Sequence, residues 1–202
     1  AYDPRGSFGQ GLSFAVANKG GDHLSSYLVA QEVFFGFLKP DSCYGKAKWV
    51  KFFEDLGCCI NSLQICQFTM YAFLMETPLS KYIPGFILGL LMQYLPSAAI
   101  SLIDYSIYKA FWSSVTGIDV SDAQFLKAGE RIHVLERYMN IREGIDRNDD
   151  TLPERLLKQG RGFDDKNKVV PLEKMLPEYY KIRGFDADGI PLETTLKKLD
   201  IM

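Results

Sequence analysis

The chain has 202 residues, enough for one large domain or two small ones. Hydrophobic residues make up 47% of it and charged residues 24%, which are ordinary proportions for a globular protein. Its formal net charge of −2 provides no overall basic field to hold nucleic acid, and its four cysteines are too few for a secreted disulfide scaffold.

The first 24 residues are rich in Gly, Ser and Asp, and they predict loops and short turns. They contain no charged region followed by a short apolar core, so we expect no signal peptide and a reducing compartment, the cytoplasm. The chain opens with AYDPRG and has no initiator methionine. Processing, or excision of one domain from a longer polypeptide, would explain that start.

Helical patterns begin at residue 23. Residues 23–37 are expected to form a helix, and the Pro, Asp, Ser and Gly at 39–45 predict a loop. A second helix is expected over 46–60. Asn61 and Ser62 are then expected to cap a following helix, because a stripe of apolar residues recurs every third position after them. That stripe comprises Ile65, Phe68, Tyr71 and Leu74.

Residues 82–103 carry no formal charge and are long enough to span a bilayer. Two prolines, a glutamine and two serines argue against a membrane span, and Pro96 is expected to divide the run. Two short core helices are therefore the preferred interpretation.

A long helix is predicted to start at Ser121, since Gln124 completes a capping box, and to stop at Gly144. Two short helices fit around 177–183 and 191–199 in a charged C-terminal arm that we expect to be peripheral, with a turn at Asp188-Gly189 between them. No strand-like alternation of any length is found. The sequence therefore predicts a mostly α fold: a single helical domain with a loop-rich N-terminal segment and an irregular C-terminal arm.

Three of the four cysteines lie between positions 58 and 66, but their spacing matches no zinc or cluster motif. Adjacent cysteines rarely form a disulfide with each other, because that geometry is strained. Buried free thiols are the expected state of Cys43, Cys58 and Cys59. Cys66 is better placed for chemistry, since it follows the expected helix cap at Ser62, where backbone N–H groups would favour a thiolate.

The chain has two histidines. His133 falls inside the predicted long helix and is expected to be a structural residue. His23 follows Gly-Gly-Asp in a loop, where an imidazole of pKa ~6.5 can carry a proton at neutral pH. The stretch at 140–155 interleaves arginines with carboxylates and predicts a solvated face or an ion-pair network at the helix exit.

Four strings of the sequence resemble one known family. They are YDPRGSFGQGLSFAVANKGGDHL (2–24), INSLQICQF (60–68), GERIHVLERYMNIREGIDRNDDTLPERL (129–156) and YYKIRGFDADGIPLETTLKKLDI (179–201). In this order and spacing they are similar to the last part of the aldehyde:ferredoxin oxidoreductase family. The resemblance implies a tungsten or molybdenum bis-pyranopterin cofactor and a [4Fe–4S] cluster.

The resemblance also implies roles for single residues. Cys66 matches the cysteine that is the fourth cluster ligand, and His23 matches a histidine beside the metal that hydrogen-bonds or moves a proton at the substrate. Asn61 stands where the family usually has a pterin-binding aspartate, and Ile65 belongs to the same cofactor-binding motif. Gln64 replaces the usual glycine. These two replacements suggest weaker or altered pterin binding and a divergent branch.

By resemblance, the chain (1–202) is the C-terminal helical domain of an enzyme whose N-terminal and middle domains lie elsewhere. Those domains would supply the other three cluster cysteines, so the isolated chain is expected to be inactive. The implied reaction oxidises aldehydes to carboxylic acids and passes electrons through the cluster to ferredoxin. Two alternatives remain: reduction of an aromatic acyl thioester, of the benzoyl-CoA reductase type, and a non-catalytic helical binding or structural domain.

Overall fold

The computed structural model of the chain describes residues 2–70, 82–162 and 167–202. It confirms the predicted mostly α fold. Within the described ranges, extended backbone pairs in a single isolated bridge, between Phe185 and Pro191. The helices are, in chain order, η1 (Pro4–Gly6), α1 (Phe8–Val16), the π-helical turn η2 (Ala30–Phe34), α2 (Lys46–Ser62), α5 (Gly85–Tyr94), α6 (Pro96–Ser101), α7 (Ser106–Thr116), α8 (Asp122–Arg142), α9 (Glu154–Lys158), α10 (Leu172–Arg183) and α11 (Glu193–Lys198).

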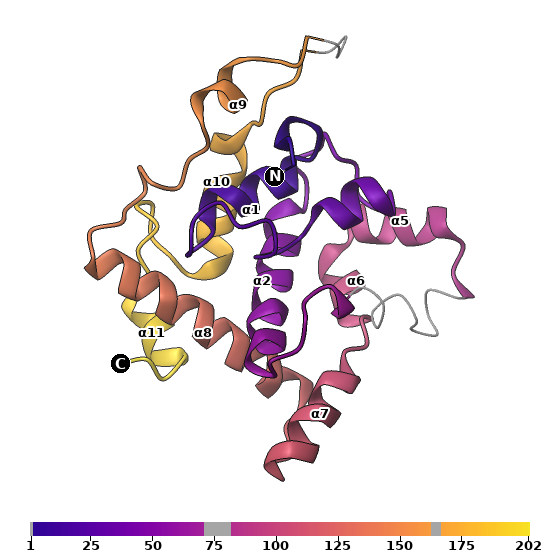
Figure 1. The fold of residues 1–202 in the computed structure, drawn as a ribbon, viewed down its shortest axis with the longest axis vertical. Coiled ribbons are helices and arrows are strands. Elements are labelled where there is room, and N and C mark those ends of the chain that lie inside the picture. Colours follow the sequence, from indigo (N-terminus) through magenta and orange to yellow (C-terminus); the bar gives the residue numbers. More distant parts are fainter. Residues whose placement is uncertain (1, 71–81, 163–166) are drawn as a thin grey trace.

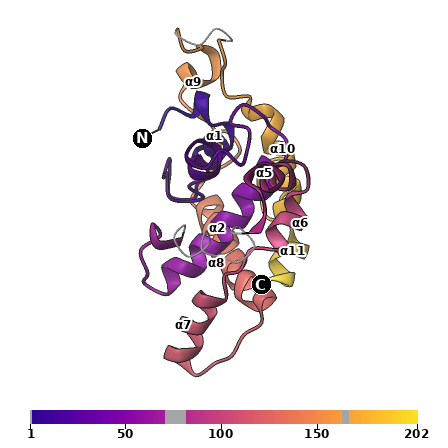
Figure 2. The ribbon, with the colours of Figure 1, turned by 90° about the vertical axis from the view of Figure 1, so that its right-hand side faces the viewer.

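Helix α2 runs through the middle of the molecule, with α1, α8 and α10 packed against it (Figure 1). Its large apolar residues recur at helical spacing, and Trp49, Phe53, Leu56 and Ile60 are at most 1% exposed. The buried indole N–H of Trp49 donates a hydrogen bond to the Met92 carbonyl at 2.9 Å, which ties α5 to α2. Helices α7 and α9 lie at opposite ends of the molecule in both views (Figure 1, Figure 2).

Helices α2 and α8 approach each other closely at Gly129. A Cβ atom at this position would lie 2.0 Å from the backbone oxygen of Asp55 and 2.7 Å from the Sγ of Cys59. Any larger residue would push the two helices apart. Next to this contact, the Cys59 thiol donates to the carbonyl of Phe125 at 3.0 Å, so Cys59 packs between the helices as a buried free thiol, as predicted.

The helix predicted over 23–37 is wrong except for η2, and the reason lies in a buried carboxylate. The N–H groups of Gly9 and Gln10, at the start of α1, donate to the carboxylate of Glu32 at 2.9 and 3.2 Å. Lys46, at the start of α2, forms a buried ion pair with the same carboxylate. The turns of 23–29 bring Glu32 to the positive end of α1, where an anion is stabilising.

The C-terminal segment is not peripheral, because α10 contributes to the core. Leu176 and Tyr179 are at most 1% exposed, and so is Arg183, near the end of the helix. The Arg183 guanidinium pairs with Glu54 at 2.6 Å and also with Asp55, both on α2. Charged residues are usually solvated, so no local pattern indicates that this arginine docks a helix.

Several start and stop signals of the sequence are confirmed. Ser121 and Gln124 form a reciprocal capping box at the start of α8. Gly144, with a φ of +95°, follows the end of that helix. The predicted turn at 188–189 separates α10 from α11 and uses a left-handed glycine, with φ of +72°.

The uncharged run at 82–103 is divided as predicted, since α5 ends at Tyr94 and α6 begins at Pro96. The expectation that both helices are core helices is wrong for α5. Phe86 and Leu90 on this helix are 71% and 56% exposed. Among the residues that the structure describes, no helix combines the length and apolar character that a membrane crossing needs.

Candidate functional site

Cys66 lies in the loop that follows α2. The hydroxyl of Ser62 donates to the carbonyl of Cys58 at 2.9 Å, so this serine closes α2. The prediction that Asn61 and Ser62 cap a following helix is therefore wrong. The expectation that backbone N–H groups at this cap favour a Cys66 thiolate is therefore wrong as well. Tyr71 and Leu74, which continue the predicted apolar stripe, lie outside the described residues.

The loop turns back over the last turn of α2. Gln64 takes a left-handed backbone with φ of +58°, the region that glycine occupies without strain. The N–H of Ile65 then donates to the carbonyl of Ile60 at 3.4 Å, and the Ile65 side chain packs partly buried against the core. A glutamine thus keeps the chain path that a glycine would take most easily.

The thiol of Cys66 is exposed, although its backbone is fixed. The Cys66 carbonyl accepts hydrogen bonds from the N–H and the hydroxyl of Thr69, at 3.0 and 2.7 Å. Asn61 and Gln64, at the same end of α2, are exposed as well. This loop therefore presents a thiol and two amides to whatever lies outside the chain. The arrangement suits ligands for a group that is shared with another part of a protein.

His23 lies on a turn after α1. Gly20, with φ of +81°, allows the turn, and the carboxylate of Asp22 accepts the N–H of Leu24 at 3.0 Å. The Nδ1 of His23 lies 3.9 Å from Asp22, and its side chain is 41% exposed. The backbone is held while the imidazole meets solvent, an arrangement that allows proton transfer. Lys19 lies 3.0 Å from the other carboxylate oxygen of Asp22.

An aromatic cluster joins the His23 turn to the Cys66 loop. The ring of Tyr27 lies 6.1 Å from the His23 imidazole and 5.6 Å from the ring of Phe68, both edge-on. Tyr2 lies 5.8 Å from the imidazole, and its hydroxyl is 3.3 Å from that of Tyr27. This hydrogen bond, with burial, raises the pKa of Tyr27 to about 12. The two predicted site segments, 43 residues apart in sequence, thus share one surface.

His133 is buried, as predicted for a structural histidine. Its Nε2 lies 3.1 Å from the hydroxyl of Tyr179. Burial, together with the nearby positive charge of Arg183, holds the pKa of His133 well below its usual value, so the imidazole is neutral. Cys58 and Cys43 are free thiols, as predicted, but they are half buried rather than buried. Burial raises the pKa of both thiols, so they are weaker nucleophiles than an ordinary exposed thiol.

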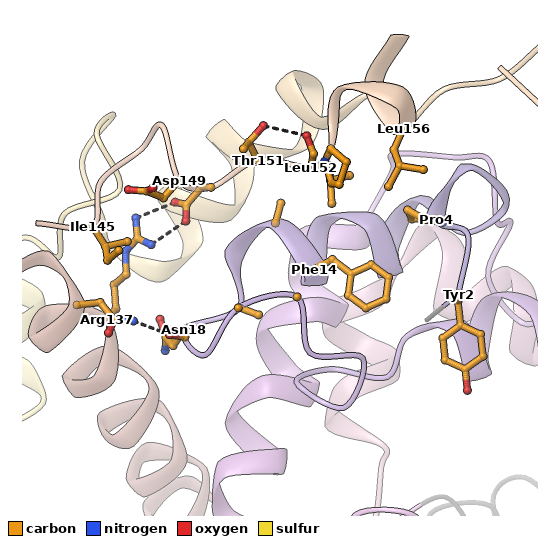
Figure 3. Close-up of a pocket in the computed structure, with 17 residues that line it drawn as sticks. Tyr2, Pro4, Phe14, Asn18, Arg137, Ile145, Asp149, Thr151, Leu152 and Leu156 are labelled. Atoms are coloured by element: carbon orange, nitrogen blue, oxygen red, sulfur yellow. Dashed lines mark hydrogen bonds and ion pairs between the residues drawn. The ribbon is translucent and has the colours of Figure 1, made fainter. Parts of the chain in front are cut away.

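A cavity of about 560 Å³ opens between the start of the chain, the end of α1 and the loop after α8 (Figure 3). Tyr2, Phe14, Leu152 and Leu156 provide much of its apolar wall. None of the predicted site residues lines it, although glycines of the His23 turn do. The walls of this cavity come from segments more than a hundred residues apart, so no local sequence pattern indicates it.

The charge-rich stretch at 140–155 supplies one buried ion pair and two exposed ones, of which Glu154 with Lys158 is local to α9. Asp150 pairs with Arg137 of α8, and Arg147 pairs with the exposed Glu173 at 2.7 Å. The predicted ion-pair network is thus present at the helix exit. It reaches partners outside the stretch and closes one end of the cavity (Figure 3).

The family model described as "Aldehyde ferredoxin oxidoreductase, domains 2 & 3" matches residues 1–201. This chain belongs to the aldehyde ferredoxin oxidoreductase family. Among its relatives are proteins named tungsten-containing aldehyde ferredoxin oxidoreductase from Pyrococcus abyssi and Pyrococcus furiosus, 33% and 32% identical over alignments of 207 positions. The protein of that name from Thermococcus kodakarensis is 33% identical over 200 positions.

These alignments cover 96–100% of this chain but 28–29% of each relative. The chain therefore spans less than a third of the length of the aldehyde ferredoxin oxidoreductases it matches. Further domains of the same enzyme are implied by the remaining length of those relatives.

Proposed function

We propose that this chain is the C-terminal helical domain of a tungsten- or molybdenum-pterin oxidoreductase and forms one wall of its cofactor site. The observation that carries the proposal is that the His23 turn and the Cys66 loop share one surface. Tyr27 contacts both the His23 imidazole and the ring of Phe68, and the free, exposed thiol of Cys66 lies two positions before Phe68. Cys66 and His23 each have a fixed backbone and an accessible side chain. A residue that binds a cofactor held outside the chain needs both properties.

Cys66 fits the role of a ligand to a [4Fe–4S] cluster. Such a cluster takes four protein ligands, and this chain offers one accessible thiol at the site. Cys58 and Cys59 cannot assist, because both belong to α2 and Cys59 is committed to the carbonyl of Phe125. The other three ligands would come from the companion domains that the length of the relatives implies.

Asn61 and Ile65 fit a pterin contact at the rim of the same loop. The exposed amide of Asn61 can donate and accept hydrogen bonds but adds no charge, in contrast to the usual carboxylate. Gln64, exposed beside it, adds a side chain that glycine would lack. We infer that the pterin at this corner is held by neutral hydrogen bonds.

When bound, the pterin-held metal would supply the two-electron chemistry that converts an aldehyde and water into a carboxylic acid, with electrons leaving singly through the cluster to ferredoxin. His23 would hold or accept a proton at the substrate oxygen. Asp22, 3.9 Å from its Nδ1, would help to orient the ring. The rings of Tyr2 and Tyr27 would restrict the imidazole to the open side.

The test uses the complete gene product, made without oxygen. We expect tungsten or molybdenum and iron in the purified protein, with iron reduced in Cys66→Ser and retained in Cys43→Ser. His23→Asn should retain both metals but lose most aldehyde-dependent reduction of a viologen dye. Activity with aromatic thioesters in place of aldehydes would favour the alternative reaction. A protein that binds neither metal nor iron would leave the non-catalytic helical domain as the remaining explanation.

A further inference from the structure

Three potential metal ligands meet between α2 and α8, and none of them belongs to the proposed cofactor site. They are the thiol of Cys58, the imidazole of His133 and the carboxylate of Glu136, and one ligand atom from each lies within 4.8 Å of the other two. His133 and Glu136 are three positions apart on α8, so they share one face of that helix. Cys58 faces them from α2.

The three residues line a small cavity of about 30 Å³, the room that a single ion or water needs. Two further residues of the cavity wall carry buried oxygens that have no hydrogen-bond partner among the described residues: Asn18 Oδ1 and Glu54 Oε1. Buried polar atoms are nearly always satisfied, so two unsatisfied acceptors around one cavity indicate a cation or a donor between them. A cation in the cavity would satisfy both oxygens, because it attracts the lone pairs of each.

The hydrogen bonds around His133 leave one ring nitrogen free. The Tyr179 hydroxyl donates its proton to Glu54 at 2.7 Å, so His133 Nε2, 3.1 Å from that hydroxyl, must be the donor in their contact. The lone pair of the neutral ring is then on Nδ1. Metal-binding histidines typically have this support, with the second ring N–H held by an oxygen that is itself hydrogen-bonded.

The side chain of Asn18 braces the other ligands. Its Nδ2 donates to the backbone carbonyl of His133 at 2.9 Å and to the carboxylate of Glu136 at 3.2 Å. Lys19, the cation on the cavity wall, has its Nζ 3.0 Å from Asp22 and so is paired outside the cluster. The cluster therefore combines positioned ligands with an excess of acceptors.

We propose that Cys58, His133 and Glu136 bind a zinc ion that ties α2 to α8. One sulfur, one imidazole nitrogen and one carboxylate oxygen are the donor types that zinc takes in a tetrahedral site. Zinc bonds of about 2.0–2.3 Å require ligand separations of roughly 3.3–3.8 Å, so the ligands must close by about 1 Å from their limit of 4.8 Å. Rotation of the exposed Glu136 side chain can supply much of that movement.

The proposed ion would lie next to the Cys66 loop. Asn61 and Gln67, which flank the predicted cluster ligand, line the same cavity. The amide of Gln67 also donates to the carbonyl of Gly57 at 3.5 Å, so the loop rests on the turn of α2 that carries Cys58. The zinc would thus stabilise the support of the Cys66 loop without taking part in electron transfer, because zinc has no redox chemistry.

The test is zinc binding to the complete gene product with its iron content measured. We expect one zinc per chain after chelator treatment and zinc titration, and zinc-edge X-ray absorption should report one sulfur ligand at about 2.3 Å among nitrogen and oxygen ligands. Cys58→Ser should remove the sulfur signal. Cys58→Ser and Glu136→Gln should each weaken zinc affinity by at least about 10-fold, because losing a residue that only supports a ligand already costs roughly 10–100-fold. Cys43→Ser, the matched control, should leave the sulfur signal and the zinc affinity unchanged.

Absence of a bound zinc equivalent would overturn the proposal and leave a water molecule as the occupant. A sulfur signal that persists in Cys58→Ser would also overturn it. Glu136 is exposed, so Glu136→Gln remains informative even where Cys58→Ser does not fold. Neither outcome depends on tungsten, molybdenum or turnover, so failure here is distinguishable from failure of the proposed oxidoreductase function.

Discussion

Arg137 and Asp150 form a buried two-point ion pair, with Nη1 and Nη2 of the arginine each 2.7 Å from a different carboxylate oxygen. Their side chains are 5% and 4% exposed. The Nε of Arg137 also donates to the carbonyl of Gly189 at 3.0 Å, and the hydroxyl of Tyr180 donates to Asp150. One arginine of α8 thereby fixes the loop before α9 and the turn between α10 and α11.

Asp150→Ala should destabilise the chain by about 3–5 kcal/mol, because it leaves the Arg137 charge buried and unpaired. Glu173→Ala is the matched control. It removes the carboxylate of an ion pair of similar length, 2.7 Å to Arg147, but Glu173 is 78% exposed, and its loss should change stability by less than about 0.5 kcal/mol. Urea denaturation of both variants measures the difference. Equal effects would contradict the role assigned to the buried pair.

Gln64 offers a test of backbone strain in the loop that carries Cys66. A left-handed conformation costs a non-glycine residue about 1–2 kcal/mol, and glycine avoids this cost. Glycine also makes the unfolded chain more flexible, which lowers the free energy of unfolding by roughly 0.5–1 kcal/mol. Gln64→Gly should therefore be about 0.5–1 kcal/mol more stable than Gln64→Ala in urea denaturation. Both variants lack the side chain, so the comparison isolates the φ of +58°. Equal stabilities would mean that the loop relaxes out of this conformation.

The sequence predicted best where one local signal decides the structure. The capping box at Ser121, the proline that begins α6 and the helical pattern over 46–60 each act within a short segment, and all three predictions are confirmed. Predictions were wrong where distant charges decide. Glu32 belongs to a segment that looks helical, but its carboxylate serves the start of α1. Arg183 looks solvated, but it pairs across 128 positions with Asp55.

The candidate site was predictable in part. The Gly-Gly-Asp turn singled out His23, and the family resemblance singled out Cys66, but periodicity carried no sign that Tyr27 and Phe68 bring the two segments together. The Cys58 cluster was missed for a similar reason. The three-residue spacing of His133 and Glu136 was visible as a metal-binding pattern, but its third member lies on another helix.

Tyr105 should make stability fall at high pH. Its side chain is 8% exposed, and burial raises its pKa to about 12, whereas the unfolded chain releases the same proton near pH 10. Between pH 10 and 12 the unfolded state therefore binds fewer protons than the folded state, and stability is lost as pH rises through this window. Tyr105→Phe should lose less stability between pH 9 and pH 11 in urea denaturation. A variant with an unchanged alkaline profile would contradict the assignment.

The apolar face of α5 should be a docking surface for a companion domain. Phe86 and Leu90 on α5, and Phe34 on η2, are 71%, 56% and 62% exposed. The 202-residue chain alone should therefore bind an apolar dye and self-associate in gel filtration. Phe86→Lys should reduce both without lowering the melting temperature. Val115→Lys on α7, at a position 85% exposed, is the control and should change neither. A monodisperse chain that binds no dye would contradict this prediction.

Thiol reactivity should separate Cys66 from the other cysteines. In protein without iron, iodoacetamide should modify the exposed Cys66 first. Cys59 should resist, because burial raises its pKa to about 12 and almost no thiolate is present at neutral pH. After iron and sulfide are restored to the complete gene product, Cys66 should become protected, and half-buried Cys43 should keep its reactivity. Peptide mass spectrometry measures each site. Continued modification of Cys66 in iron-loaded protein would rule it out as a cluster ligand, because a thiolate bound to iron is not free to attack.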